Sequence, residues 1–385
     1  MRRGLPLSFL ATLIGILLLG TGLASAHQDH ASPVVGQVYV NDNTAPVNTI
    51  AAFNRHADGT LTPLPGSPFA TGGAGTGAGI GSQGALQETA NGRYLLAVDA
   101  GSNQISVLRI GPGGGLDPVS TAGSGGNKPV SIAIHRRLVY VANAGAGDSN
   151  YTGFRLHRGV LYPIPASTFS LPDTASPGDV LFNSTGTNLV GVEVGGTQLS
   201  TSKIDSFAVG DDGRLTPAPN SPFPAQGLGP FGSEFRPTNP SQLFVSNAHG
   251  GTGAGTVSAF QVAGDGTLSS IGASPFPDHQ TAPCWVEISH DGRFLFTVNT
   301  AVQTISRYFI TRDGELVLLG STPMQGTKLG PEDARLSPDG STLWVVDTGA
   351  AAVSGFRVDG GNLNELSSSP TPLPTGATAF GIVVN

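Results

Sequence analysis

The chain contains very little cysteine, lysine or charge. Its one cysteine, Cys284, excludes an intramolecular disulfide, and the apolar residues around it predict a small buried side chain. Only three lysines occur, 12% of residues are charged, and the net charge is −7. A nucleic acid or an anionic lipid surface would require a basic stripe, so we expect neither as a partner.

Long hydrophobic runs are absent except at the N-terminus. There Arg2 and Arg3 precede the apolar segment 7–19, and small residues follow at 24–26. This order is typical of a signal peptide, and the apolar run is short for a spanning helix. We therefore predict a signal peptide at 1–26, cleavage near Ala26, a disordered tail at 27–35, and a secreted or periplasmic protein without stable membrane insertion.

What the chain has in abundance is glycine, with 56 residues, and proline, with 29. These residues punctuate seven short apolar runs, each ending in a polar side chain. The seven polar residues are Asn41, Asp99, Asn143, Glu193, Asn247, Asn299 and Asp347. The six steps from Asn41 to Asp347 average 51 residues. A period near 50 built from short strands is typical of a β-propeller.

Each repeat has the same internal order. A proline-led run is followed by a turn such as Asp291-Gly292, the apolar run, a strand with an aromatic residue, and a strand opened by leucine. This predicts an all-β, seven-bladed propeller over 36–385 with four antiparallel strands per blade. Residues 378–384 resemble a first strand with nothing after it, so we expect the C-terminal strand to join the N-terminal blade and close the ring.

The proline-led strand, the turn and the apolar run are clearest in residues 283–299, PCWVEISHDGRFLFTVN. This pattern resembles the lactonase-like seven-bladed propellers, which include bacterial 6-phosphogluconolactonases and fungal carboxymuconate cyclases. The resemblance implies a hydrolase that opens a lactone. In that family the fourth blade carries a basic run where this chain has residues 177–179, Pro-Gly-Asp. The family's glutamate falls at Val194, next to Glu193, and an arginine of its next blade falls near His249.

Three successive first strands carry charge at one aligned position: Glu234, Glu287 and Arg335. The equivalent residues elsewhere are read as Leu86, Ala133, Leu181 and Ile382. One interpretation is an interblade ion pair between Glu287 and Arg335 that holds the ring in register. The other is a catalytic site in the central channel, in which a carboxylate activates water and Arg335 stabilises the oxyanion.

The candidate site residues form two sets. The catalytic candidates are Glu287, Arg335, Glu234 and Glu193, and the binding candidates are Asp179, His249, Asp333 and Glu332. The seven polar residues that end the apolar runs are expected to hydrogen-bond the following turn. The glycine-rich stretches, including 72–81, are expected to be flexible connections between blades.

Two functions remain open from the sequence. The first is an exported hydrolase of a lactone or related ester, and the second is a non-catalytic propeller that binds a protein, glycan or small ligand. We expect a monomer, no cofactor and no metal site, although acidic channel residues offer oxygen ligands for Ca²⁺.

Overall fold

The computed structural model describes residues 1, 4, 32–172, 175–196 and 198–385. The predicted signal peptide lies almost wholly outside the described residues, as does most of the tail. Every strand lies in the unit Pro33–Asn385. The strand β1 begins at Val34, so its first two residues belong to the segment predicted as a tail. Val34 pairs with His56, and Arg55 Nη2 donates a hydrogen bond to the Val35 carbonyl.

The strands form seven antiparallel sheets, one for each predicted blade. Blade one contains β1 (Val34–Asn41), β2 (Thr49–His56), β3 (Leu61–Pro63), β4 (Phe69–Ala70) and the C-terminal β33 (Ile382–Val384). Blade two contains β5 (Leu86–Glu88), β6 (Tyr94–Asp99), β7 (Gln104–Ile110) and β8 (Leu116–Gly123). Blade three contains β9 (Pro129–His135), β10 (Leu138–Asn143), β11 (Asn150–His157), β12 (Val160–Pro163) and β13 (Phe169–Ser170). Blade four contains β14 (Pro177–Phe182), β15 (Asn188–Glu193), β16 (Lys203–Val209), β17 (Leu215–Pro217) and β18 (Phe223–Pro224).

Blades five to seven continue the pattern. Blade five contains β19 (Pro230–Arg236), β20 (Asn239–Asn247), β21 (Thr256–Val262), β22 (Leu268–Ser270) and β23 (Phe276–Pro277). Blade six contains β24 (Pro283–Ile288), β25 (Phe294–Asn299), β26 (Thr304–Ile310) and β27 (Leu316–Pro323). Blade seven contains β28 (Pro331–Leu336), β29 (Thr342–Asp347), β30 (Ala352–Asp359), β31 (Asn362–Glu365) and β32 (Thr371–Pro372). Helical structure in the described part of the chain is limited to two short 3₁₀ turns, Pro112–Gly114 and Leu199–Thr201.

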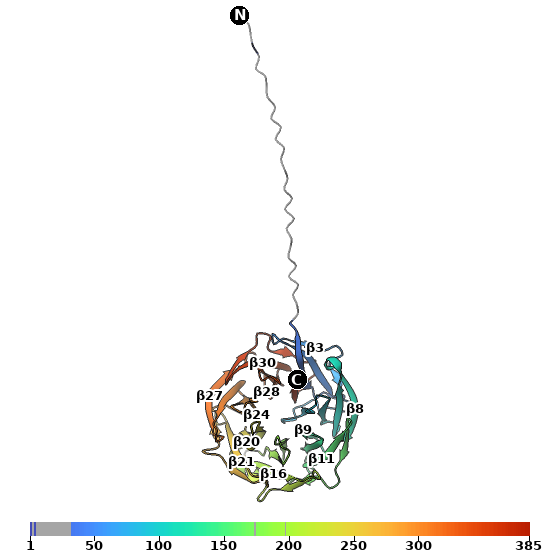
Figure 1. Ribbon diagram of the computed structural model, residues 1–385, viewed down its shortest axis with the longest axis vertical. Coiled ribbons are helices and arrows are strands. Elements are labelled where there is room, and N and C mark those ends of the chain that lie inside the picture. The colour runs from blue at the N-terminus through green and yellow to red at the C-terminus, as the bar shows by residue number, and fades with distance from the viewer. Residues whose placement is uncertain (2–3, 5–31, 173–174, 197) are drawn as a thin grey trace. The chain divides into compact units, whose positions relative to one another are not determined.

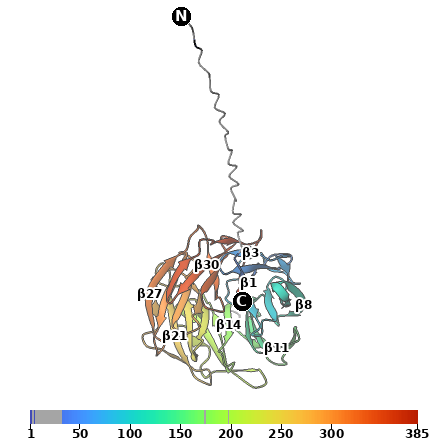
Figure 2. The same ribbon diagram turned by 45° about the horizontal axis from the view of Figure 1, so that its top comes forward.

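The sheets stand side by side in a ring, with β9, β24 and β28 near the centre and β8 and β27 at the rim (Figure 1). The view turned by 45° shows the same ring obliquely (Figure 2). The predicted seven-bladed propeller is therefore confirmed. Closure is also as expected, because β33 pairs with β1 through Val38 with Val384 and Val40 with Ile382.

The outer strand is interrupted in five blades, and a serine compensates for each interruption. Two short strands, such as β3 and β4, both pair with the third strand and leave one of its N–H groups between them. The Ala52 N–H donates to Ser67 Oγ across this gap. The same bond joins Gly153 to Ser167, Ser206 to Ser221, Ala259 to Ser274 and Gly355 to Ser369. The serine, which is followed by Pro-Phe in blades one, four and five, thus accepts the hydrogen bond that the interrupted strand leaves unmade.

The polar residues that end the second strands have different partners from those predicted. Only Asn41 accepts a hydrogen bond from the turn that follows, from the Asn43 N–H. Asp99, Asn299 and Asp347 bond to hydroxyls of the third strand, on Ser106, Ser306 and Ser354. In each case the serine lies two residues beyond the one that pairs with the polar residue, so its side chain is on the same face of the sheet and its hydroxyl bonds the buried side chain in place of the turn.

Candidate active site in the central channel

The first strands of blades five, six and seven bring three charged side chains to the same height. Glu234, Glu287 and Arg335 are each the fifth residue of their strand, and they pair with Phe244, Phe296 and Trp344. These partners each lie three residues before the polar end of the second strand, so the alignment read from the sequence is correct here.

The alignment was wrong for two other blades. Pairing places Gln87 of blade two and Val384 of blade one at this position, rather than Leu86 and Ile382. The strands β19, β24 and β28 each contain an irregularity near their start, which inserts extra residues before the charged position. Counting the same number of residues from the start of the strand therefore gives a different position in blades one and two.

Arg335 lies between the two glutamates. Its Nη1 atom is 3.2 Å from Glu287 Oε2 and 3.8 Å from Glu234 Oε2. The other oxygen of Glu287 accepts a hydrogen bond of 3.0 Å from the Leu336 N–H. The Glu287 side chain is 7% exposed, whereas the side chains of Glu234 and Arg335 are 24% and 26% exposed. The interblade ion pair is therefore present, and Glu234 and Arg335 remain in contact with solvent.

Two aspartates extend the cluster deeper into the channel. Asp179 Oδ2 accepts hydrogen bonds from the Ser233 N–H at 3.0 Å and the Ser233 hydroxyl at 2.6 Å. Asp333 accepts from the Ala334 N–H at 2.9 Å and from the Gly84 N–H at 3.3 Å. Both carboxyl groups are buried.

One guanidinium thus faces four carboxyl groups, and this ratio controls their protonation. Burial, and then the negative charge of Glu287, raise the pKa of Glu234 to about 8, although Arg335 opposes the shift. Burial raises the pKa of Asp179 to about 7 and that of Asp333 to about 6. Burial lowers the pKa of Arg335, but the four carboxylates outweigh it and raise that pKa above its usual value. The site therefore holds a fixed cation and carboxyl groups that exchange protons near neutral pH.

The connection between blades one and two crosses the channel at the level of the aspartates. The Gln83 N–H donates to the Gly178 carbonyl, and Gln83 Nε2 donates to the Ser233 carbonyl at 2.8 Å. Gln83 Oε1 accepts from the Val286 N–H at 3.2 Å. Gln83 therefore links blade four through its backbone, and blades five and six through its side chain. The glycine-rich stretch was predicted to be a flexible connection, but these bonds, and those of Gly75 and Gly77 to the loop after β1, fix it in place.

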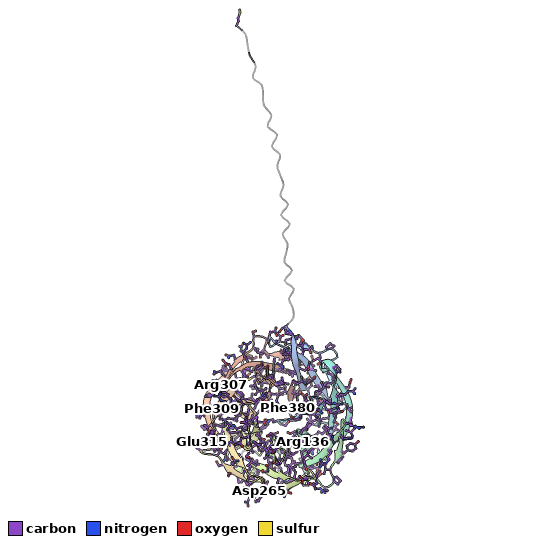
Figure 3. The ribbon with its side chains drawn as sticks, in the orientation of Figure 1. Arg136, Asp265, Arg307, Phe309, Glu315 and Phe380 are labelled. Atoms are coloured by element: carbon purple, nitrogen blue, oxygen red, sulfur yellow. The ribbon has the colours of Figure 1, made fainter. Side chains whose placement is uncertain are left out.

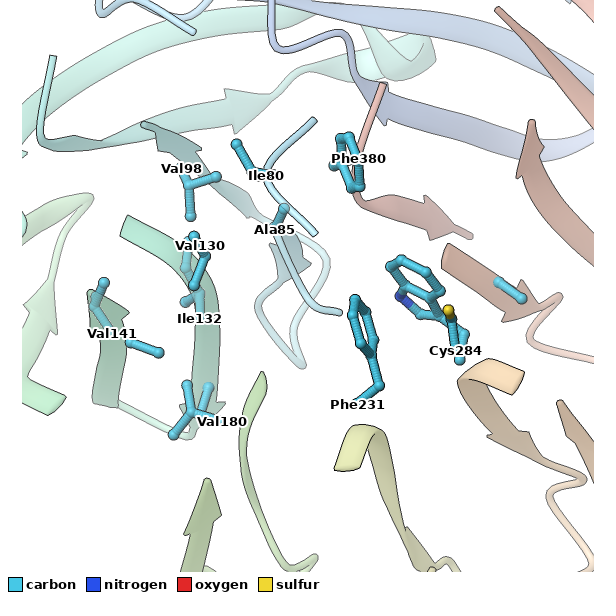
Figure 4. Close-up of a cluster of buried hydrophobic side chains, with 14 of the residues drawn as sticks. Ile80, Ala85, Val98, Val130, Ile132, Val141, Val180, Phe231, Cys284 and Phe380 are labelled. Carbon is cyan, nitrogen blue, oxygen red and sulfur yellow. The ribbon is translucent and has the colours of Figure 1, made fainter. Parts of the chain in front are cut away.

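Aromatic side chains surround this segment toward the starts of the first strands. Phe231 and Trp285 have ring centroids 5.2 Å apart, and Trp285 and Phe380 6.5 Å apart. Ile80, Phe231, Cys284 and Phe380 gather here in Figure 4. Cys284 is buried, and burial raises the pKa of its thiol to about 12, which agrees with the predicted structural role. The charged cluster therefore meets solvent from the opposite side, where the first strands end.

The remaining candidates lie elsewhere. Glu193 is beside Asp205 of β16, and burial raises both pKa values. His249 is exposed, and its Nδ1 lies 3.2 Å from the Gly196 carbonyl oxygen. Glu332 lies close enough to Cys284 to affect its thiol, and burial and Asp333 raise the pKa of Glu332 to about 8. Of the eight predicted residues, the structure joins Asp179, Glu234, Glu287, Asp333 and Arg335 in one cluster.

Within the described ranges, no group of three His, Cys, Asp or Glu side chains is arranged to hold a metal ion. The same part of the chain contains no helix long and apolar enough to cross a membrane.

Comparisons with known proteins support the fold and part of the sequence pattern. The family model "Lactonase, 7-bladed beta-propeller" matches residues 234–378, which begin at Glu234 and include Glu287 and Arg335. A search of curated proteins finds no significant match.

Solved structures match over almost the whole ring. A protein from Bacteroides uniformis, described as a proposed 6-phosphogluconolactonase, is 17% identical with a TM-score of 0.72, covering 91% of this chain and 99% of its own. The periplasmic gluconolactonase PpgL of Pseudomonas aeruginosa is 18% identical with a TM-score of 0.68, covering 91% and 98%. Hydrazine synthase of Kuenenia stuttgartiensis is 15% identical with a TM-score of 0.60, covering 87% and 99%. The resemblance to the lactonase-like seven-bladed propellers is thus confirmed, by the family model over residues 234–378 and by the fold over the ring.

Proposed function

We propose that the protein hydrolyses a lactone or related ester at the channel cluster of Glu234, Glu287 and Arg335. The observation that carries the proposal is a partly exposed guanidinium held between two carboxyl groups, on the blades that match the lactonase model. A fixed cation next to a carboxylate is what water addition to an ester carbonyl requires.

The two glutamates have different roles in this proposal. Both oxygens of Glu287 are engaged, by Arg335 and the Leu336 N–H, so Glu287 is a positioning residue that orients the guanidinium. Glu234 is more exposed, and its contact to Arg335 is longer, so its carboxylate is more available to accept a proton from water. From the sequence, Glu287, Glu234 and Glu193 were all candidates for the catalytic carboxylate, and these contacts favour Glu234 as the base.

The reaction balances without a further reagent. Ionised Glu234 takes a proton from water as the water oxygen bonds to the carbonyl carbon, and Arg335 stabilises the resulting oxyanion. The ring C–O bond then breaks, and the proton on Glu234 passes to the departing alkoxide. The products are a hydroxy acid and the enzyme in its original state.

The test is hydrolysis of a panel of five- and six-membered lactones by the purified protein and by Glu234→Gln. We expect turnover to fall by more than about 100-fold in this variant, because general base catalysis contributes that much or more. Glu315→Gln, which changes an exposed glutamate at the rim (Figure 3), is the matched control and should keep full activity. Undiminished turnover in Glu234→Gln would refute the assigned base.

The pH profile gives a second readout. Because the pKa of Glu234 is about 8 in the free protein and the base must be ionised, kcat/KM should rise with pH, reach half its maximum near pH 8 and level off about one pH unit higher. Glu287→Gln should lower kcat more than it raises KM, since it misplaces Arg335 without removing the base. A flat profile between pH 6 and 9 would contradict the mechanism.

A non-catalytic binding propeller is the second candidate. Asp179, where the resemblance implies a basic run, is fully engaged by Ser131 and Ser233 and is buried. If no lactone is turned over by a folded protein, this function gains support, and affinity capture with protein and glycan arrays becomes the next experiment.

We also propose export as a monomer, on the basis of residues 1–26 and of the fold shared with the periplasmic PpgL. Fractionation of cells that express the full chain tests this, with the mass of the released protein reporting cleavage near Ala26. Size-exclusion chromatography with light scattering should give one mass, that of a single chain.

A further inference from the structure

A cavity of about 700 Å³ lies between blades two and three, outside the central channel. Three hairpin turns line it: residues 89–94 between β5 and β6, Arg136 and Arg137 between β9 and β10, and residues 156–158 at the end of β11. Its size is that of a pocket for a small molecule or short oligomer. We call it the arginine groove.

The arginine groove is strongly basic in an acidic protein. Arg93, Arg136, Arg137 and Arg158 line it together with His157, and no aspartate or glutamate does so. Ion pairs among the described residues involve Arg109, Arg214 and Arg335 instead. Two carboxylates lie nearby: Glu88, whose Oε1 approaches Gly92 in the turn at 89–94, and Asp211, which lines a neighbouring hollow with Arg136 and Arg137. The residues that line the groove therefore include four arginines and no carboxylate.

The backbone of two of these arginines is strained. Arg136 has a φ of 56° and Arg158 a φ of 51°, a region that disfavours side chains other than glycine, asparagine and aspartate. The turns that correspond to that of Arg136, between the first and second strands, carry glycine with positive φ in blades two, four, six and seven, at Gly92, Gly186, Gly292 and Gly340. An arginine at a position where glycine is less costly points to a role for its side chain beyond the turn.

The groove also has an aromatic wall. Tyr94 packs close to Gly159, where an added Cβ would lie 3.0 Å from the ring. The Arg93 guanidinium lies 5.9 Å from the centre of the same ring. A flat apolar surface flanked by planar cations fits a ligand with alternating ring faces and anionic groups.

We propose that the arginine groove binds an acidic oligosaccharide, a short sugar chain that carries carboxylate or sulfate groups. Guanidinium groups bind such anions in a bidentate manner, and the half-buried Tyr94 ring offers apolar contact for a sugar. A nucleic acid is a poorer fit, because it would extend beyond two blades over a protein of net charge −7. The proposal does not depend on the lactone hydrolysis proposed above.

Calorimetric titration of the full chain with five probes tests the proposal. Two probes are acidic sugars, a uronate tetrasaccharide and a heparin tetrasaccharide. The other three are uncharged maltotetraose, inorganic tripolyphosphate and a single-stranded octanucleotide. We expect at least one acidic tetrasaccharide to bind more tightly than the other three probes, and its affinity to fall as salt rises. Tighter binding of tripolyphosphate or of the octanucleotide, or no binding of either acidic sugar, would overturn the proposal.

The variants are Arg136→Gly and Arg158→Gly, because glycine accepts both backbone conformations and should leave the fold intact. Each should weaken binding of the acidic tetrasaccharide by about tenfold or more, the usual loss for one hydrogen bond to a charged group. Arg312→Ala removes an exposed arginine from blade six and is the matched control. Equal affinity in all three variants would show that the sugar binds elsewhere.

Discussion

At the scale of single residues, the channel is defined by an imbalance of charge. One positive charge, on Arg335, can balance only one carboxylate. Four carboxyl groups lie close enough to raise its pKa: Asp179, Glu234, Glu287 and Asp333. Burying unpaired charge is costly, so the surplus carboxyl groups keep their protons to higher pH. The native state therefore binds protons that the unfolded chain releases.

This imbalance makes stability depend on pH. The pKa of Asp179 is about 7 in the folded protein, against an ordinary value of 3.8. The native state consequently holds more protons than the unfolded state between these values, and the free energy of unfolding falls as pH rises from about 4 to 7. Asp179→Asn removes this titration and should reduce the loss of stability between pH 5 and 8 by more than ~1 kcal/mol.

Urea unfolding of both proteins at pH 5 and 8 measures this difference. Asp211→Asn changes an exposed aspartate and serves as the control. An unchanged pH dependence in Asp179→Asn would show that the carboxyl is already ionised at pH 5.

The alignment of Glu234, Glu287 and Arg335 was predictable from the sequence, because the repeat places them at one position in three successive blades. The role of Gln83 was not predictable, because the partners of its side chain lie 150 and 203 residues away and no repeat relates a loop to them. Glu193 was assigned to the site by its residue type, but the repeat places it next to the third strand, where Asp205 stands.

At the scale of elements, the outer strand of five blades is interrupted, and a serine hydroxyl replaces the backbone hydrogen bond that is lost there. Ser167 is the most informative case, because its hydroxyl both accepts from the Gly153 N–H and donates to the Gly153 carbonyl. The residue is buried, so water cannot replace either bond. The sequence predicted a strand at this point but gave no indication that it is split.

Ser167→Ala should lower the free energy of unfolding by about 1–3 kcal/mol, the usual cost of leaving a buried polar group without its partner. Ser170→Ala, which changes an exposed residue on β13, should have little effect. Chemical denaturation of the two variants gives the comparison. Equal stability would mean that the split strand relaxes to re-form its own ladder.

At the scale of the whole ring, stability depends on the last strand. Ile382, Val383 and Val384 are buried, and β33 supplies the innermost strand of blade one, so that β1 is paired on both sides. The number of blades and their closure could be predicted from the period of the repeat. The segment across the channel could not, because it belongs to no repeat.

Deletion of residues 378–385 should abolish cooperative unfolding or cause aggregation, since it exposes the edge of β1 and the core beneath it. Ile382→Ala is the milder test and should lower the free energy of unfolding by about 2–5 kcal/mol. Asn385→Ala controls for changes at the terminus itself. Thermal unfolding followed by circular dichroism distinguishes these results, and a truncated chain with the original Tm would contradict the role of β33.

The pairing of β33 with β1 has one more consequence. The Gln37 and Asn385 backbones hydrogen-bond to each other. The C-terminal residue of the folded unit therefore lies beside a residue close to its N-terminal end at Pro33. A short linker between the two ends would give a covalent circle, and the chain could then be cut between any two blades that tolerate new ends. Such circular permutants should build the same ring, because the order of blades around a circle has no first member.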